Sequence, residues 1–116
     1  MNSLSYMRIE RDFGSFDEWQ KDFIACGLSA RSGYVITAYN IYLKRYMNFV
    51  IDDEAKNVPI GTHPVIVLDT SEGAYYRDYV DDQKTYILAM MKEFNWESIE
   101  GRFKKAEKMA KIGGGR

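Results

Sequence analysis

The chain has 116 residues, of which 46% are hydrophobic and 15% aromatic, and its formal net charge at pH 7 is −1. That length and apolar content predict one folded domain and exclude an intrinsically disordered protein, because a chain of this size can bury a packed core. The near-zero charge, with acidic and basic residues interspersed, gives no general electrostatic signature for nucleic acid or for a basic membrane-binding arm.

A single cysteine and a single histidine limit the chemistry available to the side chains. Cys26 has no partner for an internal disulfide and is expected to pack as an inert thiol in an apolar helix, which is typical of a reducing compartment. No apolar run reaches the roughly 20 residues that cross a bilayer, and the first residues lack a secretory or organellar leader pattern. The sequence predicts a soluble protein without membrane insertion, and it leaves the compartment open between the cytoplasm and the mitochondrial matrix.

The first predicted helix begins with a capping box. Ser15 can accept a hydrogen bond from a first-turn amide, and Glu18 can reach back to the amide of the capping residue. Aromatic residues then recur at helical spacing: Phe16, Trp19 and Phe23. Gly27 is expected to weaken or end this helix, because glycine is a poor helix former and is frequent at helix C-termini.

Three segments in the middle of the chain are typical of β-strands. Residues 34–39 are aromatic and β-branched, residues 43–51 alternate between apolar and polar, and residues 65–68 form a short apolar run. The second segment carries its apolar residues on one face: Leu43, Met47, Phe49 and Ile51. A polar loop over residues 52–61 precedes the third segment. We predict a three-stranded antiparallel sheet.

Helical spacing returns after the third strand, from about Glu72. Two apolar stripes predict two helices: Tyr86, Ile87, Met90, Met91 and Phe94 in one, and Ile99, Phe103, Ala106 and Ala110 in the last. Asn95 can end the first of these or cap the second. The fold class is α+β, with an N-terminal helix, the sheet and C-terminal helices. Residues 1–112 form one domain, and residues 113–116 form a flexible glycine-rich tail.

Four short motifs, in order along the chain, resemble sequences of the iron/manganese superoxide dismutases. The segment Glu72-Gly-Ala-Tyr-Tyr76 is similar to the family's Glu-His-Ala-Tyr-Tyr signature, and Asp69 stands where that signature has its aspartate. Three further motifs are similar to the opening, the first strand and the last helix of the family's C-terminal domain: Asp12-Phe-Gly-Ser-Phe16, Arg31-Ser-Gly-Tyr34 and Asn95-Trp96. The resemblance covers nearly the whole chain and implies the α+β C-terminal domain of that family.

The resemblance also implies that the family's metal site is degenerate in this chain. Gly73 replaces a histidine ligand, so Asp69 is a vestigial ligand position, and the two histidines of the family's N-terminal helical domain have no counterpart. Ser71 and Tyr34 stand where the family has tryptophans around the metal, and Lys56 where many members have a glutamine. We therefore expect no bound metal, no cofactor and no catalytic residue.

Structural roles compete with functional ones at the remaining candidates. Asp69 is interpreted as a cap for the helix that follows the third strand. His63 precedes a proline and is interpreted as a surface residue, roughly 20 Å from Asp69 along one strand at ~3.3 Å per residue. Glu72 and Tyr76 match residues that cross the family's dimer interface, but a first-turn acid and a core tyrosine explain them equally well.

We hypothesise a non-catalytic domain, a pseudoenzyme, that acts as a structural or protein-interaction subunit of a larger assembly, such as a mitochondrial ribosome or another organellar complex. A protein partner or a second copy would cover the face left by the absent N-terminal domain, around Tyr34, Glu72, Tyr75 and Tyr76. Two alternatives stay open: a superoxide dismutase completed by a separate histidine-bearing chain, and a small regulatory or inhibitor protein. Nucleic acid is expected only peripherally, within such an assembly.

Overall fold

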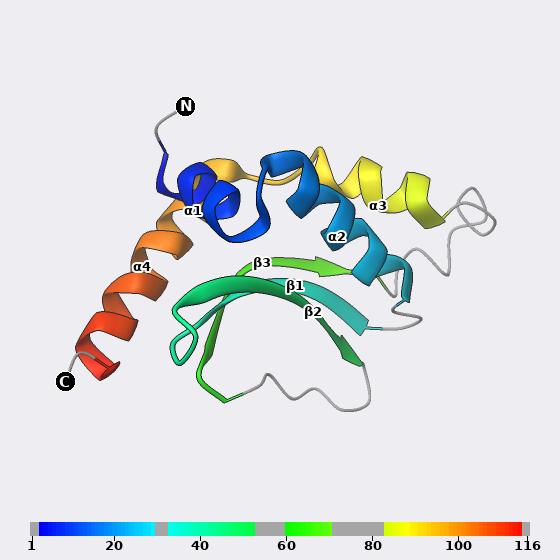
Figure 1. Ribbon diagram of the computed structural model, residues 1–116. Helices are drawn as coiled ribbons and strands as arrows, with labels where there is room; N and C mark the ends of the chain where they lie inside the picture. Colours follow the sequence, from blue (N-terminus) through cyan, green and yellow to red (C-terminus); the bar gives the residue numbers. More distant parts are fainter. Residues whose placement is uncertain (1–2, 30–32, 53–59, 71–82, 115–116) are drawn as a thin grey trace.

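A computed structural model describes residues 3–29, 33–52, 60–70 and 83–114 of the chain (Figure 1). The elements follow in the order α1 (Leu4–Phe13), α2 (Phe16–Ser29), β1 (Gly33–Asn40), β2 (Arg45–Asp52), β3 (Thr62–Asp69), α3 (Gln83–Met91) and α4 (Trp96–Gly114). The helices lie over one face of the sheet, which gives a two-layer α+β domain (Figure 1). The predicted fold class is confirmed.

The three strands form an antiparallel sheet in the order β2-β1-β3, so β1 is central and pairs with both neighbours. The second strand begins later than the sequence predicts, at Arg45, and Leu43 lies in the preceding turn, where it is 60% exposed. The cause is Asn40, whose Oδ1 accepts hydrogen bonds from the amides of Tyr42 and Leu43. Lys44 then adopts a left-handed φ of 57°, which reverses the chain before β2.

Alternation along the strands separates two apolar clusters, one on each face of the sheet. The larger cluster lies between the sheet and the helices and includes these fully buried side chains: Trp19, Phe23, Val35, Tyr46 and Phe103. The smaller cluster lies on the opposite face and consists of Ile36, Ala38 and Ile51, against which Tyr34 and Phe49 pack. The central strand β1 therefore contributes side chains to both clusters.

Helix α1 is not predicted by the sequence pattern, because few of its apolar residues recur at helical spacing. Ser3 caps it by accepting a hydrogen bond from the Tyr6 amide at 3.3 Å. A second cap comes from α4, where Glu100 accepts hydrogen bonds from the Leu4 and Ser5 amides, each at 2.8 Å. A carboxylate at this end also complements the helix dipole. The helix is thus fixed mainly by a tertiary contact.

Helix α2 begins as predicted, with the Ser15 hydroxyl accepting a hydrogen bond from the Glu18 amide at 3.0 Å. The helix does not end at Gly27 but continues to Ser29. Gly27 is buried, and a Cβ atom there would lie 2.9 Å from Cδ1 of Ile87 in α3. The glycine therefore allows α2 and α3 to approach closely, which explains why a poor helix former occupies this position.

We expect the Gly27→Ala substitution to be neutral or destabilising, although alanine is favoured over glycine in a helix by ~1 kcal/mol. The new methyl group must displace the Ile87 side chain, and this cost offsets the gain in helix propensity. The matched control is Gly101→Ala in α4, where nothing lies within 4 Å of the added Cβ, and which should stabilise the protein by up to ~1 kcal/mol. Urea denaturation of both variants checks this, and equal stabilisation by both would contradict it.

The C-terminal helices bury the faces that the sequence predicts. In α3, Tyr86, Ile87 and Met91 are buried, and in α4 so are Ile99, Phe103 and Ala106. Asn95 caps α4, since its Oδ1 accepts hydrogen bonds from the amides of Glu97 and Ser98 at 3.1 and 3.2 Å.

The predicted helix start near Glu72 lies outside the described residues. Helix α4 continues to Gly114, two residues into the segment predicted as a tail, and the division at residue 112 stays a prediction. Within the described segments, no helix is long and apolar enough to cross a membrane.

Candidate functional site

The candidate metal ligand Asp69 is the last residue of β3, and the register places it opposite Tyr34 at the start of β1. The next residue fixes this end of the sheet, because both the amide and the hydroxyl of Thr70 donate to the Gly33 carbonyl, at 2.8 and 3.0 Å. The hydroxyl of Tyr86 in α3 donates to the Asp69 carbonyl at 3.4 Å. Asp69 thus has a well-defined position at the junction of β1, β3 and α3.

Several candidates from the sequence lie outside the described residues. These are Lys56, Ser71, Glu72, Gly73, Tyr75 and Tyr76. Of the predicted interface, the structure therefore places Tyr34, which is half-buried and packs against the smaller apolar cluster. The roles of Asp69 as a helix cap and of Glu72 as a first-turn acid stay predictions.

His63 lies near the opposite end of β3 from Asp69, as the sequence predicts. The register pairs His63 with Tyr39 and Asp69 with Tyr34, so six residues of extended strand separate them, roughly 20 Å at ~3.3 Å per residue. The imidazole is half-buried rather than fully exposed, because the strand begins at Thr62 and already includes it. His63 and Asp69 therefore cannot bind one ion together.

Cys26 is a free, half-buried thiol on α2. Burial raises its pKa, and the negative charge of Asp22 raises it further. Both effects favour the protonated thiol, which is a poor nucleophile and a poor metal ligand. This environment agrees with a packing role for the side chain.

A polar network that sequence reasoning missed joins α1, β2 and α4. Arg8 binds Glu107 through two hydrogen bonds, from Nε at 2.7 Å and Nη2 at 3.2 Å, and the Tyr46 hydroxyl donates to the same carboxylate at 2.8 Å. Burial alone would raise the pKa of Glu107, but the hydrogen bonds from Arg8 and Tyr46 outweigh it and hold that pKa below its ordinary value. Burial and then Glu107 raise the pKa of Tyr46. At neutral pH Glu107 is therefore ionised and remains paired with Arg8, which gives the network a structural role.

Asp12 gives the motif Asp12-Phe-Gly-Ser-Phe16 a structural explanation. Its carboxylate accepts a hydrogen bond from the Tyr46 amide at 2.7 Å and binds Arg11 through two hydrogen bonds, at 2.7 and 3.0 Å. Its carbonyl accepts a further hydrogen bond from Arg45 at 3.0 Å. Gly14 follows with a φ of 98°, a conformation that side chains disfavour. The motif therefore ends α1 and attaches it to the first residues of β2.

Comparison with known proteins identifies the family. The model of the C-terminal domain of iron/manganese superoxide dismutases matches residues 3–102. The manganese superoxide dismutase 1 of Halobacterium salinarum is 32% identical over 99 residues, which are 85% of this chain and 49% of the relative. The iron superoxide dismutase of Cupriavidus metallidurans is 38% identical over 97 residues, or 82% and 49% of the two chains. The chain belongs to the iron/manganese superoxide dismutase family, through its C-terminal domain.

The chain spans about half the length of the curated relatives that it matches. In the described residues, no three or more side chains of His, Cys, Asp or Glu are grouped so that they could hold a metal ion. The full sequence contains one histidine, and that histidine is at the wrong end of β3. The donor groups that the structure places near Asp69 therefore do not fit the metal centre that the family implies, because iron and manganese need several nitrogen and oxygen ligands in a fixed arrangement.

Proposed function

We propose that the chain is a non-catalytic superoxide dismutase-like domain that acts as a structural or protein-interaction subunit of a larger assembly. The proposal rests on the small number of side chains that are available as metal ligands. One histidine occurs in the whole sequence, and six residues of β3 separate it from Asp69, the vestigial ligand position. Gly73, at the position of a histidine in the family signature, has no side chain that could replace it.

The relatives' printed names state superoxide dismutase activity with iron or manganese, and that activity needs a tightly held ion. A lone carboxylate cannot supply such affinity, because selective binding of these ions requires several ligands and surrounding groups that hydrogen-bond to the ligands and orient them. What this domain retains from the family is the packed α+β framework. Retention of the framework without the donors supports a role in which the folded surface, rather than a metal, is the functional part.

The face of the sheet opposite the helices supports an interaction role. Ile36, Ala38 and Ile51 make up its apolar cluster, and Val67, which the register places opposite Ile36, remains 45% exposed. Tyr34, at the start of β1, packs against this cluster and is half-buried. In the proposed function, a protein partner or a second copy covers the surface around Tyr34, together with Glu72, Tyr75 and Tyr76. Exposed apolar residues of this kind mark contact surfaces.

The test is a metal and activity measurement on the protein purified under gentle conditions from its native source, so that any partner stays bound. We expect far less than one iron or manganese per chain, no superoxide turnover, and a reproducible partner in the purified complex. The variant Asp69→Asn should leave the metal content unchanged, which separates adventitious metal from a ligand at this position. Stoichiometric iron or manganese that is lost in Asp69→Asn, together with turnover, would establish the enzyme, and a free monomer without partner would contradict the subunit role.

A further inference from the structure

The turn between β1 and β2 is held rigidly and presents apolar side chains to solvent. The Asn40 side chain accepts hydrogen bonds from the Tyr42 and Leu43 amides at 2.9 and 3.0 Å, and the Asn40 carbonyl accepts one from Lys44 at 2.7 Å. Despite this order, Tyr42 is 70% exposed and Leu43 is 60% exposed. A turn this well fixed does not need exposed apolar side chains for its own stability.

A second segment adds to the same surface. The amide of Ile41 donates to the Gly61 carbonyl at 2.9 Å, which brings residues 60–61 beside the turn. The Tyr42 ring lies so close to Gly61 that a Cβ on residue 61 would collide with the ring. Ile60, the preceding residue, is 88% exposed. We call Tyr42, Leu43 and Ile60 the apolar tip.

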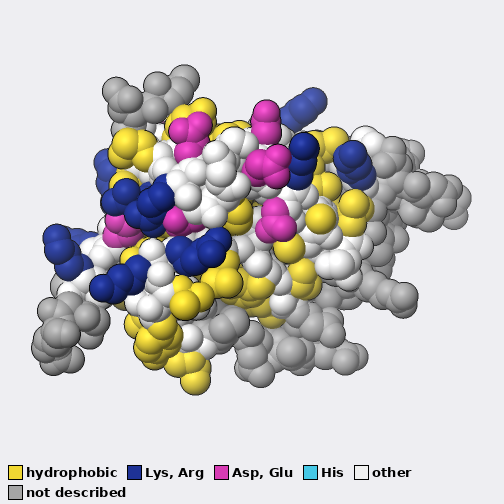
Figure 2. All heavy atoms as spheres, in the orientation of Figure 1, with side chains coloured by type: hydrophobic (Ala, Val, Ile, Leu, Met, Phe, Trp, Pro, Cys, Tyr) yellow, Lys and Arg dark blue, Asp and Glu magenta, His cyan; other side chains and the backbone are white. Residues whose placement is uncertain are grey.

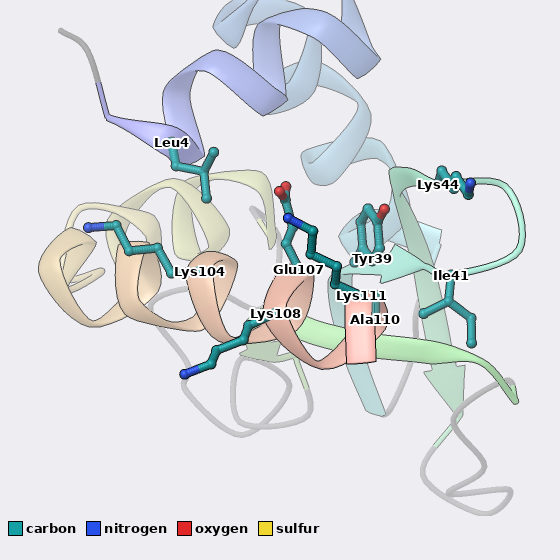
Figure 3. A pocket seen from close by; sticks show the side chains of 9 residues that line it. All are labelled: Leu4, Tyr39, Ile41, Lys44, Lys104, Glu107, Lys108, Ala110 and Lys111. Atoms are coloured by element: carbon teal, nitrogen blue, oxygen red, sulfur yellow. The ribbon is translucent and has the colours of Figure 1, made fainter. Parts of the chain in front are cut away.

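A groove of about 560 Å³ adjoins the apolar tip and is lined by residues of four elements or turns (Figure 3). Lys104, Lys108 and Lys111 come from α4, and Lys44 comes from the turn that carries the tip. Tyr39 of the central strand and Ile41 of the turn also line the groove, and Tyr39 lies between α4 and the turn that carries Lys44 (Figure 3). We call the four lysines and this concave surface the lysine groove.

Among the described residues, four lysines and one carboxylate, that of Glu107, line the groove, and the charge of Lys104 also acts on the nearby Glu100. Among the described residues, none of its four lysines forms an ion pair. Glu107 also lines the groove, but Arg8 and Tyr46 already occupy its carboxylate. Figure 2 shows basic side chains gathered over the region of α4 and the β1–β2 turn, with apolar surface directly below them. The surface is therefore locally cationic although the whole chain carries a net charge of −1.

We propose that the apolar tip and the lysine groove together form a docking surface for an anionic phospholipid membrane. The groove lysines contact headgroup phosphates, and Tyr42, Leu43 and Ile60 enter the boundary between headgroups and acyl chains. Lysines near an anionic leaflet attract it additively, and a tyrosine ring is suited to the interface because it joins an apolar body to a hydroxyl. This surface lies apart from the Tyr34 face, so the inference stands independently of the proposed function.

Two other classes of partner fit the surface less well. A nucleic acid would use the lysines, but its phosphate backbone offers nothing to the exposed aliphatic side chains of Leu43 and Ile60. Protein-protein interfaces are depleted in lysine relative to the rest of the surface, whereas four lysines line this groove. The basic side chains of the groove are lysines, and lysine attracts phosphate as a point charge without needing a partner of fixed geometry.

The test is co-sedimentation of the purified protein with vesicles of phosphatidylcholine alone or mixed with phosphatidylglycerol. We expect binding to the mixed vesicles at low salt, little binding to phosphatidylcholine, and loss of binding as salt rises. The double variants Leu43→Ser with Ile60→Ser, and Lys108→Glu with Lys111→Glu, should each weaken binding about tenfold or more. Far-ultraviolet circular dichroism confirms that each variant is folded, and all substituted side chains are exposed.

Matched controls make the same kinds of substitution elsewhere on the surface. Met7→Ser with Leu28→Ser removes two exposed apolar side chains, and Lys84→Glu with Lys92→Glu makes the same charge change on and beside α3. Both controls should bind as the unchanged protein does. The proposal fails if the unchanged protein does not bind mixed vesicles, or if the controls weaken binding as much as the test variants. It also fails if a single-stranded RNA competes through the lysines while the Leu43 and Ile60 substitutions have no effect, since the groove would then be a nucleic-acid site.

Discussion

Replacing Trp19 by alanine is expected to lower the free energy of unfolding by about 3–5 kcal/mol, the range for removing a fully buried large aromatic side chain. Trp19 is fully buried, and its ring centroid lies 5.1 Å from Phe16, 5.2 Å from Phe23 and 5.8 Å from Trp96. Urea denaturation followed by circular dichroism measures the loss. Since domains of this size have total stabilities of about 5–15 kcal/mol, the loss is a large fraction of the total, and the variant should unfold at a clearly lower urea concentration.

Trp19 also begins a chain of hydrogen bonds that crosses from α2 to the sheet. Its Nε1 donates to the Thr37 hydroxyl at 2.9 Å, Thr37 donates to Asn48, and Asn48 donates to Asp22 at 3.0 Å. The variant Trp19→Phe keeps one buried ring but removes the donor, so its loss combines the missing hydrogen bond, about 1–2 kcal/mol, with a smaller cavity than that of Trp19→Ala. Trp96→Ala is the control, because that ring is only half-buried. A loss from Trp19→Ala no larger than that from Trp96→Ala would contradict the prediction.

The second large effect is expected at Glu107, where substitution by glutamine should cost about 2 kcal/mol at neutral pH, the scale of hydrogen bonds to a charged group. The glutamine keeps the size of the side chain but leaves Arg8 without its ion-pair partner and weakens the hydrogen bond from the buried Tyr46. The side chains of Arg8 and Glu107 are 30% and 23% exposed, so solvent screening reduces the effect below that of a fully buried pair. A double-mutant cycle with Tyr46→Phe measures the coupling, and additive losses would show that the contact contributes nothing.

The same carboxylate predicts a pH dependence. Despite burial, which acts in the opposite direction, hydrogen bonds hold the pKa of Glu107 below its ordinary value of 4.5 in the folded protein. The unfolded chain therefore binds a proton at higher pH than the folded one, and the stabilisation is complete above pH 4.5 and is lost as the pH falls through the lower folded value. Glu100 acts in the same direction: burial would raise its pKa, but the hydrogen bonds from Ser5 and Leu4 outweigh burial and lower it. The free energy of unfolding of Glu107→Gln should change less across this acid range than that of the unchanged protein. The exposed control Glu93→Gln should show the same pH dependence as the unchanged protein.

Local patterns were sufficient to predict most of the elements. The stripes of α3 and α4 are periodic over several residues, and the structure buries most of them. In the second strand the predicted apolar face is only partly buried, with Ile51 in the smaller cluster, whereas Tyr46 on the other face is fully buried. The errors arose where a single residue or a distant contact decides the local structure. Asn40 holds a turn that removes Leu43 from the second strand, and Gly27 serves a helix contact with Ile87 that no local pattern contains.

The separation of the two candidate ligands Asp69 and His63 could be predicted, because both lie on one strand. Asp69 and His63 are separated by strand geometry alone, and the structure places them near opposite ends of β3. The Arg8–Glu107–Tyr46 network was not predictable, because its members are 99 and 61 residues apart in the sequence. The lysine groove was missed for a related reason. The turn after β1 contributes Lys44, and α4 contributes the other three lysines. The net charge of the chain, −1, does not show that these lysines lie together on one surface.

The cap that Glu100 provides for α1 has a consequence for the order in which the protein forms during synthesis. A helix of ten residues is marginal in isolation, and α1 receives its strongest amide acceptor from a residue 96 positions later. While the ribosome is still translating the strands, the first helix therefore has its Ser3 cap but not the carboxylate that accepts from its first two amides. The beginning of α1 gains this second cap only once α4 has formed, which couples the completion of the first described helix to that of the last one.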